Sequence, residues 1–519
     1  MVWLALSLAC VEKVDEDLDT EVVDADTAAD TDTDSGDTDS GDTDSGDTDS
    51  GDTDSGDTDS GDTDSGDTDS GGTDSGGTDS GDTDSGGTDS GETSDTADTA
   101  STLGFLGSVE VDAVATWSTH GGTREGRIGS IDNLALAEDL DGDGTSDLVI
   151  GSPFEAPGSV FVLPEPSRWG GDVETDAVAI VEGASELGFV PLSCGDVTGD
   201  GAADLVVGDR SVDGLGAAYV FAGPLSGTAA VGDAWMTVEG AWATAEWGEA
   251  SDAADLDGDG VVELVAGAAE TGAGVFGVAS AAAGVWSAGD LSLTWGGTSG
   301  DQLGATVVLG DLNLDGYADA LVGAPGRDDA ATDAGAVVGY PGAATGLGAA
   351  SWTFLGPPTS AARAGTNSRG VIRPVDLDDS GLPDVAVSAY AAGTVAVHVD
   401  PAPGTYAWTD AATRLGETGS SCGSALSTGD LDADGDADLL VGCYSDPDRA
   451  AQGGSLWLFT DLPSGDLGRA DASGEVWTAA ADQYLGTAAA TRDGVLYVVA
   501  SWRSERIYRG GTLWASAGW

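Results

Sequence analysis

Short apolar runs bounded by glycine recur throughout residues 104–519. Each unit starts with an apolar run that often holds tryptophan, such as "AWMTV", "LSLTW", "SWTFL", "YAWTD" or "EVWTA". A short alternating run leads into an acidic nonapeptide, followed by runs such as "DLVIGSP" and a glycine-led run such as "GSVFVL". β-Branched and aromatic residues in short runs between glycines are typical of strands. Four such runs per unit predict a four-stranded antiparallel blade.

The acidic nonapeptide sets the period of the repeat. It begins at residues 139, 196, 255, 311, 376 and 430, so the starts are 57, 59, 56, 65 and 54 residues apart. A seventh unit from Tyr484, "YLGTAAATRDGVLYVVAS", keeps the frame but has lost the acids. A regular period of this length indicates a repeat architecture, and blades arranged around an axis bury both of their faces. The sequence therefore predicts an all-β, seven-bladed β-propeller over residues 104–519.

The nonapeptides have the composition of a metal-binding hairpin. Oxygen-bearing side chains occupy positions 1, 3, 5 and 9, and position 6 is glycine in all six, as in Gly144. Ca²⁺ takes six to eight oxygen ligands, and so many carboxylates are stable together only around a cation. We therefore predict Ca²⁺ as the cofactor. The predicted ligands are Asp139, Asp141, Asp143, Asp147, Asp196, Thr198, Asp200, Asp204, Asp255, Asp257, Asp259, Glu263, Asp311, Asn313, Asp315, Asp319, Asp376, Asp378, Ser380, Asp384, Asp430, Asp432, Asp434 and Asp438.

A helical EF-hand is the main rival interpretation of these nonapeptides. An EF-hand needs a bidentate glutamate at position 12. That position holds only apolar residues here, from Ile150 in the first unit to Val441 in the sixth, and its flanks are strand-like. The loops with four carboxylates should bind calcium more strongly than those in which Thr198, Asn313 or Ser380 replaces one.

The hairpin pattern and the "GAP" segment at Gly323-Ala324-Pro325 resemble the FG-GAP repeat of the integrin α-subunit N-terminal propeller. The resemblance covers about four fifths of the chain and implies structural Ca²⁺ in a propeller that binds partners. The chain departs from the family where Phe-Gly is expected. It has Ile128-Gly129, Trp247-Gly248, Leu303-Gly304 and Cys422-Gly423 there, and the fifth unit is irregular.

Charge is spread unevenly over the 519 residues. The chain has 93 acids and 16 bases, and 33 of the acids lie in residues 11–100. Residues 36–90 are eleven copies of "GDTDS" or "GGTDS", which have nothing to bury, so residues 11–103 are predicted to be a disordered acidic linker. The linker is interpreted as a spacer, with a solubilising tail as the alternative. An acidic surface of this kind excludes nucleic acid and anionic membranes as partners.

The first ten residues, "MVWLALSLAC", are a short apolar run that ends in cysteine. They resemble a bacterial lipoprotein signal in which Cys10 becomes lipidated, although no basic residue precedes the run and Ser7 departs from the usual motif. The alternative is a truncated ordinary signal peptide or a misplaced start. Either version predicts an extracytoplasmic protein, which is secreted or held at the outer membrane or cell surface.

The remaining cysteines are Cys194, Cys422 and Cys443. Cys422 and Cys443 flank the sixth hairpin on adjacent predicted strands, so a disulfide between them is left open, and Cys194 is expected to be a small buried hydrophobe. If each tryptophan-bearing run is the outermost strand of the preceding blade, the segment near Val109–Ser118 should complete the last blade beside Gly511–Trp519.

This phasing distributes the arginines over two faces of the ring. Twelve of the fifteen are predicted on the face away from the metal hairpins, and the metal side receives Arg168, Arg469 and Arg492. Those expected away from the metals are Arg124, Arg127, Arg210, Arg327, Arg363, Arg369, Arg373, Arg414, Arg449, Arg503, Arg506 and Arg509. Arginine forks suit anionic groups, so this face is a candidate site for a glycan or a surface protein. Local pairing with neighbouring acids is the alternative.

We expect a calcium-binding surface or secreted propeller that acts as a binding or adhesion module. The partner is a surface protein or a glycan, and membrane contact is expected only through an N-terminal lipid anchor. A propeller-type polysaccharide lyase or hydrolase is the alternative, and a structural coat component is a third. No acid–base constellation supports an enzyme: His120 and His398 are far apart in sequence, and His398 is expected to be a strand residue.

Overall fold

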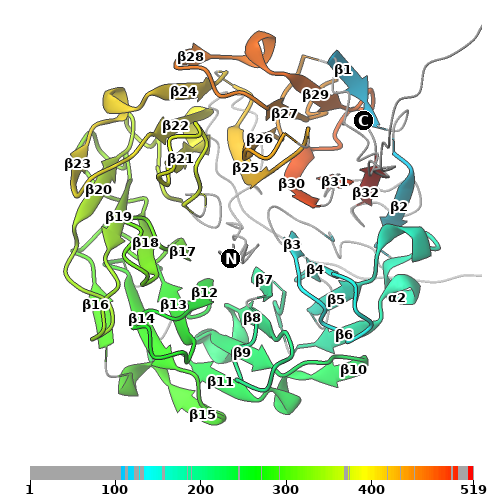
Figure 1. Cartoon of the computed structure of the whole chain (residues 1–519), viewed down its shortest axis with the longest axis vertical. Helices are drawn as coiled ribbons and strands as arrows, with labels where there is room; N and C mark the ends of the chain where they lie inside the picture. Colours follow the sequence, from blue (N-terminus) through cyan, green and yellow to red (C-terminus); the bar gives the residue numbers. More distant parts are fainter. Residues whose placement is uncertain are drawn as a thin grey trace, which may run out of the picture. The chain divides into compact units, whose positions relative to one another are not determined.

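The computed structural model describes the propeller unit and none of the predicted linker. The described residues are 107–111, 115–121, 128, 134–154, 158–183, 185–188, 190–193, 195–242, 246–269, 272–291, 293–366, 372, 374–417, 419–432, 434–448, 450–492, 495–500 and 512–517. Cys10, Cys194 and the linker lie outside these residues. The described strands form seven separate sheets arranged as a ring (Figure 1), which confirms the predicted seven-bladed all-β propeller.

Blades 1 to 4 each contain four antiparallel strands, in chain order from the axis outward. Blade 1 holds β3 (Leu134–Leu136), β4 (Leu148–Ser152), β5 (Ser159–Leu163) and β6 (Ala179–Glu182). Blade 2 holds β7 (Val190–Ser193), β8 (Leu205–Asp209), β9 (Ala217–Phe221) and β11 (Met236–Glu239). Blade 3 holds β12 (Ala250–Ala254), β13 (Glu263–Ala268), β14 (Val275–Ser280) and β16 (Leu293–Gly296). Blade 4 holds β17 (Val307–Gly310), β18 (Asp319–Ala324), β19 (Ala336–Tyr340) and β20 (Trp352–Leu355).

Blades 5 to 7 vary this plan. Blade 5 holds β21 (Val385–Ala389), β22 (Thr394–His398) and β24 (Thr413–Gly416). In its innermost position, the described residues include a bridge between Val375 and Asp384. Blade 6 holds β25 (Cys422–Gly429), β26 (Asp438–Cys443), β27 (Ser455–Phe459) and β29 (Gly474–Trp477). Blade 7 holds β30 (Leu485–Arg492), β31 (Val495–Ala500), β32 (Thr512–Ala517) and the early strand β2 (Trp117–His120). Cys422 and Cys443 pair across β25 and β26 and form a disulfide, which answers the question left open by the sequence.

The ring closes through β2, as predicted, but the closing segment is divided between two blades. Trp117 and Ser118 pair with Ala515 and Trp514 of β32, so β2 completes blade 7. Val109 lies instead in β1 (Gly107–Glu110), which runs parallel to β29 at the outer edge of blade 6. The N-terminal part of the propeller therefore secures both of the last two blades.

Five blades carry a fifth, outermost strand that the sequence analysis missed. All five run parallel to strand four of the blade that they cover. Four of them come from the connection between strands three and four of the next blade, whereas β1 comes from the segment before blade 1. They are β10 (Gly227–Ala230) on blade 1, β15 (Gly284–Ser287) on blade 2, β23 (Gly404–Tyr406) on blade 4, β28 (Gly465–Leu467) on blade 5 and β1 on blade 6. Blade edges are thereby covered by the neighbouring unit.

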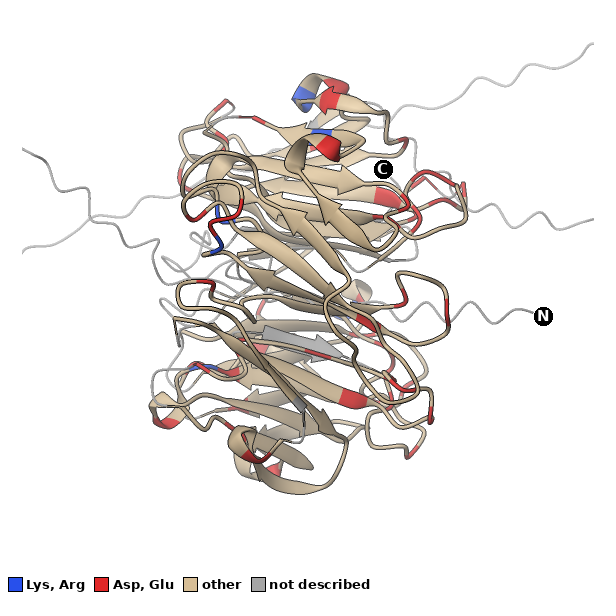
Figure 2. Cartoon of the chain, turned by 90° about the vertical axis from the view of Figure 1, so that its left-hand side faces the viewer, with Lys and Arg blue, Asp and Glu red and all other residues tan. Residues whose placement is uncertain are grey.

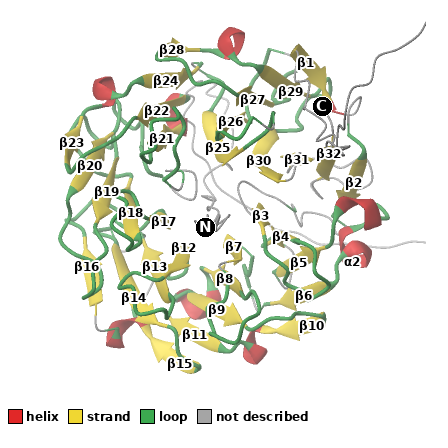
Figure 3. Ribbon diagram, in the orientation of Figure 1, coloured by secondary structure: helices red, strands yellow, loops and turns green. Residues whose placement is uncertain are grey.

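Helices are few, short and located in the connections (Figure 3). One of them corrects a prediction: "YAWTD" is not a single strand, because Tyr406 ends β23 and Trp408–Asp410 form a 3-10 helix. The others are α2 (Val173–Asp176) and the 3-10 helices Pro166–Arg168, Val212–Gly214, Val231–Asp233, Ala288–Asp290, Tyr390–Ala392 and Arg469–Asp471.

The hydrophobic core is divided among the junctions between blades. Each of seven buried clusters combines side chains of two neighbouring blades, including Leu134 with Leu513 across the junction of blades 1 and 7. On the face opposite the acidic hairpins, glycines bring these blades into backbone contact. A Cβ on Gly323 would lie 2.1 Å from the carbonyl oxygen of Gly365, whose φ is +70°. Ala364-Gly365 is therefore the Phe-Gly equivalent that the sequence analysis did not find in the fifth unit.

Candidate metal centres

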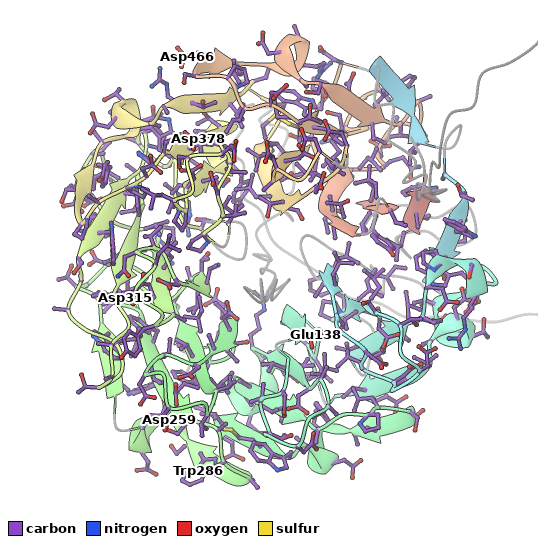
Figure 4. All side chains as sticks on the ribbon, viewed as in Figure 1. Glu138, Asp259, Trp286, Asp315, Asp378 and Asp466 are labelled. Carbon is purple, nitrogen blue, oxygen red and sulfur yellow. A yellow bond between two sulfur atoms is a disulfide. The ribbon has the colours of Figure 1, made fainter. Side chains whose placement is uncertain are left out.

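The six acidic nonapeptides are hairpin loops between the first and second strand positions of blades 1 to 6. We number them loops 1 to 6: residues 139–147, 196–204, 255–263, 311–319, 376–384 and 430–438. Strands on both sides exclude the EF-hand. Asp259, Asp315 and Asp378, from loops 3, 4 and 5, follow one another around the ring (Figure 4). The seventh hairpin, between β30 and β31, is short and has no acidic nonapeptide.

The first aspartate of each loop organises the turn. In loop 1, Asp139 accepts hydrogen bonds from the backbone N–H of Gly142 at 2.7 Å and Gly144 at 2.8 Å. The glycine N–H at position 6 donates to the first aspartate in every loop, at 2.7–3.1 Å. Gly144 has a φ of +90°, which glycine adopts without strain. The invariant glycine therefore serves both the sharp turn and the orientation of a carboxylate.

The ninth residue of each loop is buried at the start of the second strand. In loop 1, Asp147 is 2% exposed and accepts the N–H of Leu140 at 2.8 Å. The same bond joins Leu312 to Asp319 and Leu377 to Asp384, both at 2.9 Å. Position 2 is in turn a buried apolar residue. The carboxylate at position 9 therefore holds the backbone of position 2, whose apolar side chain is buried, and also directs its own charge into the loop.

The structure brings three carboxylates together in four of the loops. Within each group, one oxygen of every residue lies within 4.8 Å of the others. The groups are Asp139, Asp141 and Asp147; Asp255, Asp257 and Asp259; Asp376, Asp378 and Asp384; and Asp430, Asp432 and Asp438. Loops 2 and 4 do not form a three-carboxylate group among the described residues, since Thr198 and Asn313 occupy their third positions.

In each of these four loops, one predicted ligand lies outside the group of three. Asp143 forms an ion pair with Arg168 at 2.8 Å, which confirms the placement of this arginine on the metal side. Glu263 and Asp434 complete the predicted ligand sets of loops 3 and 6 but are not within the 4.8 Å groups. Ser380 of loop 5 donates to Asp400 at 2.8 Å, an acid from the next connection that the sequence analysis did not identify.

Burial makes these carboxyl groups difficult to ionise without a cation. It raises the pKa of Asp147 and Asp438 to about 7 and the pKa of Asp319 and Asp384 to about 6. Neighbouring carboxylates such as Asp141 raise the pKa of Asp147 further, and the N–H donors oppose both effects. A divalent ion reverses this balance because it is the largest positive charge available to such a site.

Four of the arginines predicted away from the metals are described, and three of them are engaged by the chain's own acids. The fourth, Arg363, donates to Gln302 at 3.1 Å and to Thr366 at 3.4 Å. Arg210 contacts Glu186 at 2.7 Å, Arg327 contacts Asp329 at 2.6 Å, and Arg414 contacts Asp466 at 2.6 Å. In Figure 2 basic residues are few beside the acidic ones. Eight of the arginines predicted away from the metals lie outside the described residues: Arg124, Arg127, Arg369, Arg373, Arg449, Arg503, Arg506 and Arg509. For Arg210, Arg327 and Arg414, local pairing is the observed arrangement.

The prediction that Arg469 belongs to the metal side is wrong. Its guanidinium is bonded to Asp446 and lies 2.8 Å from Asp448, in the loop that follows the "GAP"-like segment of blade 6. It also lies 5.6 Å from the ring centre of Trp457. The reason is that β28 passes along the edge of blade 5, and this detour carries Arg469 away from the metal hairpins.

Family models match three parts of the chain. An FG-GAP repeat model matches residues 132–163 and 303–340, and an FG-GAP-like repeat model matches residues 376–441. These segments contain loops 1, 4, 5 and 6. Among solved structures, the chain is similar to the crystal structure of the WD40 domain from Toxoplasma gondii coronin, with 10% sequence identity and a TM-score of 0.43. That match covers 78% of this chain and 84% of the other.

Proposed function

Since this chain carries FG-GAP repeats on a seven-bladed propeller, we propose that it is a calcium-binding module that recognises a partner outside the cytoplasm. The observation that carries the calcium assignment is a buried, unsatisfied oxygen. Oδ1 of Asp147 and Oδ1 of Asp438 have no hydrogen-bond partner within the described part of the chain. Such an oxygen is costly to bury and is the kind of ligand that Ca²⁺ prefers.

The ions would be held by the predicted residues at positions 1, 3, 5 and 9 of each loop. Ca²⁺ supplies positive charge there and performs no reaction. The protein's part is to hold the carboxylates and, through the ninth residue, the backbone of position 2. Each ion would thereby stiffen one junction of the ring, and a rigid ring presents its remaining loops in a fixed arrangement, which lowers the entropic cost of binding a partner.

Calcium dependence of unfolding tests the metal assignment. We expect Ca²⁺ in excess over its Kd to raise the Tm by about 10 °C, because several sites bind the folded state alone. Differential scanning calorimetry of the full chain in Ca²⁺, in Mg²⁺ and in chelator measures this shift, with Mg²⁺ as the control for ionic strength and charge. An unchanged Tm in chelator, together with no Ca²⁺ bound in equilibrium dialysis, would contradict the proposal.

The proposed partner is a glycan or a surface protein. Support comes from the FG-GAP repeats, which are typical of extracellular proteins, and from the signal-like segment and linker that precede the propeller. Lipidation at Cys10 with residues 11–103 as a spacer would hold the propeller away from a membrane. Among the described residues, no helix has both the length and the apolar character needed to cross a bilayer.

A binding array separates the candidate functions. The full chain is applied to immobilised glycans and bacterial surface proteins, with Ca²⁺ and with chelator. We expect calcium-dependent binding without turnover. Release of unsaturated or reducing ends from acidic polysaccharides would favour the lyase or hydrolase, and concentration-dependent self-association without ligand binding would favour the coat component.

A further inference from the structure

The second carboxylate oxygen of the ninth residue divides the metal loops into two groups. In loops 2, 4 and 5 this oxygen accepts a backbone N–H from the connection that follows strand three. The donors are Gly223 to Asp204 at 2.9 Å, Gly342 to Asp319 at 2.8 Å and Asp400 to Asp384 at 3.0 Å. In loops 1 and 6 the corresponding oxygens of Asp147 and Asp438 are the unpartnered ones, and these side chains are 2% and 1% exposed.

The amino-acid sequence divides the loops in the same way. Loops 2, 4 and 5 are those in which Thr198, Asn313 or Ser380 replaces a carboxylate. Loops 1 and 6 keep aspartate at all four ligand positions. The carboxylate count and the backbone hydrogen bond are independent observations, because the N–H donors lie 16–23 residues beyond the ninth position. Loops with fewer charges therefore have their buried carboxylate satisfied by the protein itself.

We propose that loops 1 and 6 require calcium to hold their conformation, whereas loops 2, 4 and 5 keep theirs without it. This inference rests on the proposed calcium-binding function and adds an order of dependence among the sites. An unpaired buried carboxylate oxygen is costly without a cation, so the loop that holds it loses stability when the ion leaves. Loop 3 has four carboxylates but no such orphaned oxygen within the described residues, so it belongs to neither group.

The two calcium-dependent loops secure particular junctions of the ring. Leu140 of loop 1 is buried in the core shared by blades 1 and 2, and its carbonyl oxygen accepts the N–H of Leu225 at 2.6 Å. Leu431 of loop 6 is buried in the core shared by blades 6 and 7, beside Leu496. The N–H groups of Leu140 and Leu431 are held by Asp147 and Asp438. Loss of calcium would therefore loosen two junctions, that of blades 1 and 2 and that of blades 6 and 7.

Hydrogen exchange on the full chain, read by mass spectrometry, tests this order. On transfer from Ca²⁺ to chelator, we expect amides in peptides covering loops 1 and 6 to exchange at least tenfold faster. Peptides covering loops 4 and 5 should change by less than about threefold. Equal acceleration in all of these loops, with calcium bound beforehand, would overturn the inference and leave the proposed function standing. Absence of bound calcium would overturn the proposed function itself.

Two matched pairs of Asp→Asn substitutions give a second test, because the inference predicts opposite changes of the Tm in chelator for the two pairs. Asp147→Asn and Asp438→Asn remove a buried charge that lacks a partner, so their Tm in chelator should equal or exceed that of the parent. In Asp319→Asn and Asp384→Asn, one of two oxygens that each accept a backbone N–H becomes an NH2 group, which donates and cannot accept, so their Tm in chelator should fall. The first pair should lose more of the calcium-induced Tm shift than the second. The reverse order of loss would contradict the proposal.

Discussion

His398 is a buried imidazole without a hydrogen-bond partner in the described part of the chain. It lies in β22, is 2% exposed, and both of its ring nitrogens are unpaired. Aromatic rings surround it, with the centroids of Phe354 and Tyr406 at 5.0 and 5.5 Å. Burial lowers the pKa of His398 to about 4, and the charge of Asp410 opposes this only in part. The expectation of a strand residue rather than a catalytic base is consistent with this environment.

The depressed pKa of His398 predicts acid sensitivity at the junction of blades 4 and 5. Between pH 6.5 and about pH 4, the imidazole of His398 is protonated in the unfolded chain but neutral in the folded chain. The stability that neutral His398 allows above pH 6.5 is therefore lost as the pH falls, by about 3 kcal/mol. Denaturant unfolding of the parent and of His398→Leu across this range measures the effect as a difference. The two stability curves should diverge on acidification, and parallel curves would contradict the prediction.

Single residues also show where sequence reasoning ended. The ligand positions could be read from the nonapeptide, because spacing, glycine and strand context all lie within one local hairpin. Whether the second carboxylate oxygen of the ninth residue accepts a hydrogen bond could not be read from the nonapeptide. Its N–H donor lies in a distant connection whose sequence differs from blade to blade, as Gly223 and Asp400 show. Arg469 was placed on the wrong side for the same reason, since its position depends on β28 pairing with another blade.

The fifth strands show the same limit for elements, although here a signal was present. Five connections contain glycine followed six residues later by aspartate. Four of them, "GTAAVGD", "GVWSAGD", "GTYAWTD" and "GDLGRAD", begin with a fifth strand, whereas "GGDVETD" in blade 1 contains α2 instead. In the structure the aspartate closes the turn after the strand. Asp233 accepts the N–H of Ala230 at 2.9 Å, and Asp410 accepts the N–H of Ala407 at 2.8 Å. The motif could have been found by aligning the units, but its parallel pairing with the previous blade is a tertiary property.

Blade 3 lacks this covering strand. The connection in blade 4 that would supply it, residues 341–351, contains no glycine-to-aspartate motif, and β16 has no outer neighbour among the described strands. "YAWTD" was misassigned because an aromatic run beside a glycine fits a strand as well as it fits β23 followed by a 3-10 helix. Local pattern therefore predicted the inner three strands of the blades well and the outer edge less well.

For the whole molecule, the number of blades followed from the period and from the seventh unit, which lacks the acidic nonapeptide. That unit retains strand pairing, since β30 and β31 are in register from Ala488 to Arg492, but it has no metal loop to secure the next junction. The junction of blades 7 and 1 instead depends on strand exchange and on the packing of Leu134 and Leu136 against Ala488, Tyr497 and Leu513. Closure and metal binding are therefore complementary ways of stabilising the same ring.

Truncation distinguishes the closing strands from the segment that precedes them. A chain that begins at residue 104 retains β1 and β2. It should melt within about 1 °C of the full chain, because the repeats of residues 36–90, which make up most of the removed linker, have no large apolar side chains to bury. A chain that begins at residue 122 loses β2 from blade 7 and buried Val111 from the junction of blades 6 and 7. We expect its Tm to fall by about 5 °C or more. Scanning calorimetry of both chains in saturating Ca²⁺ compares them directly, and equal melting temperatures would show that closure through β2 does not stabilise the ring.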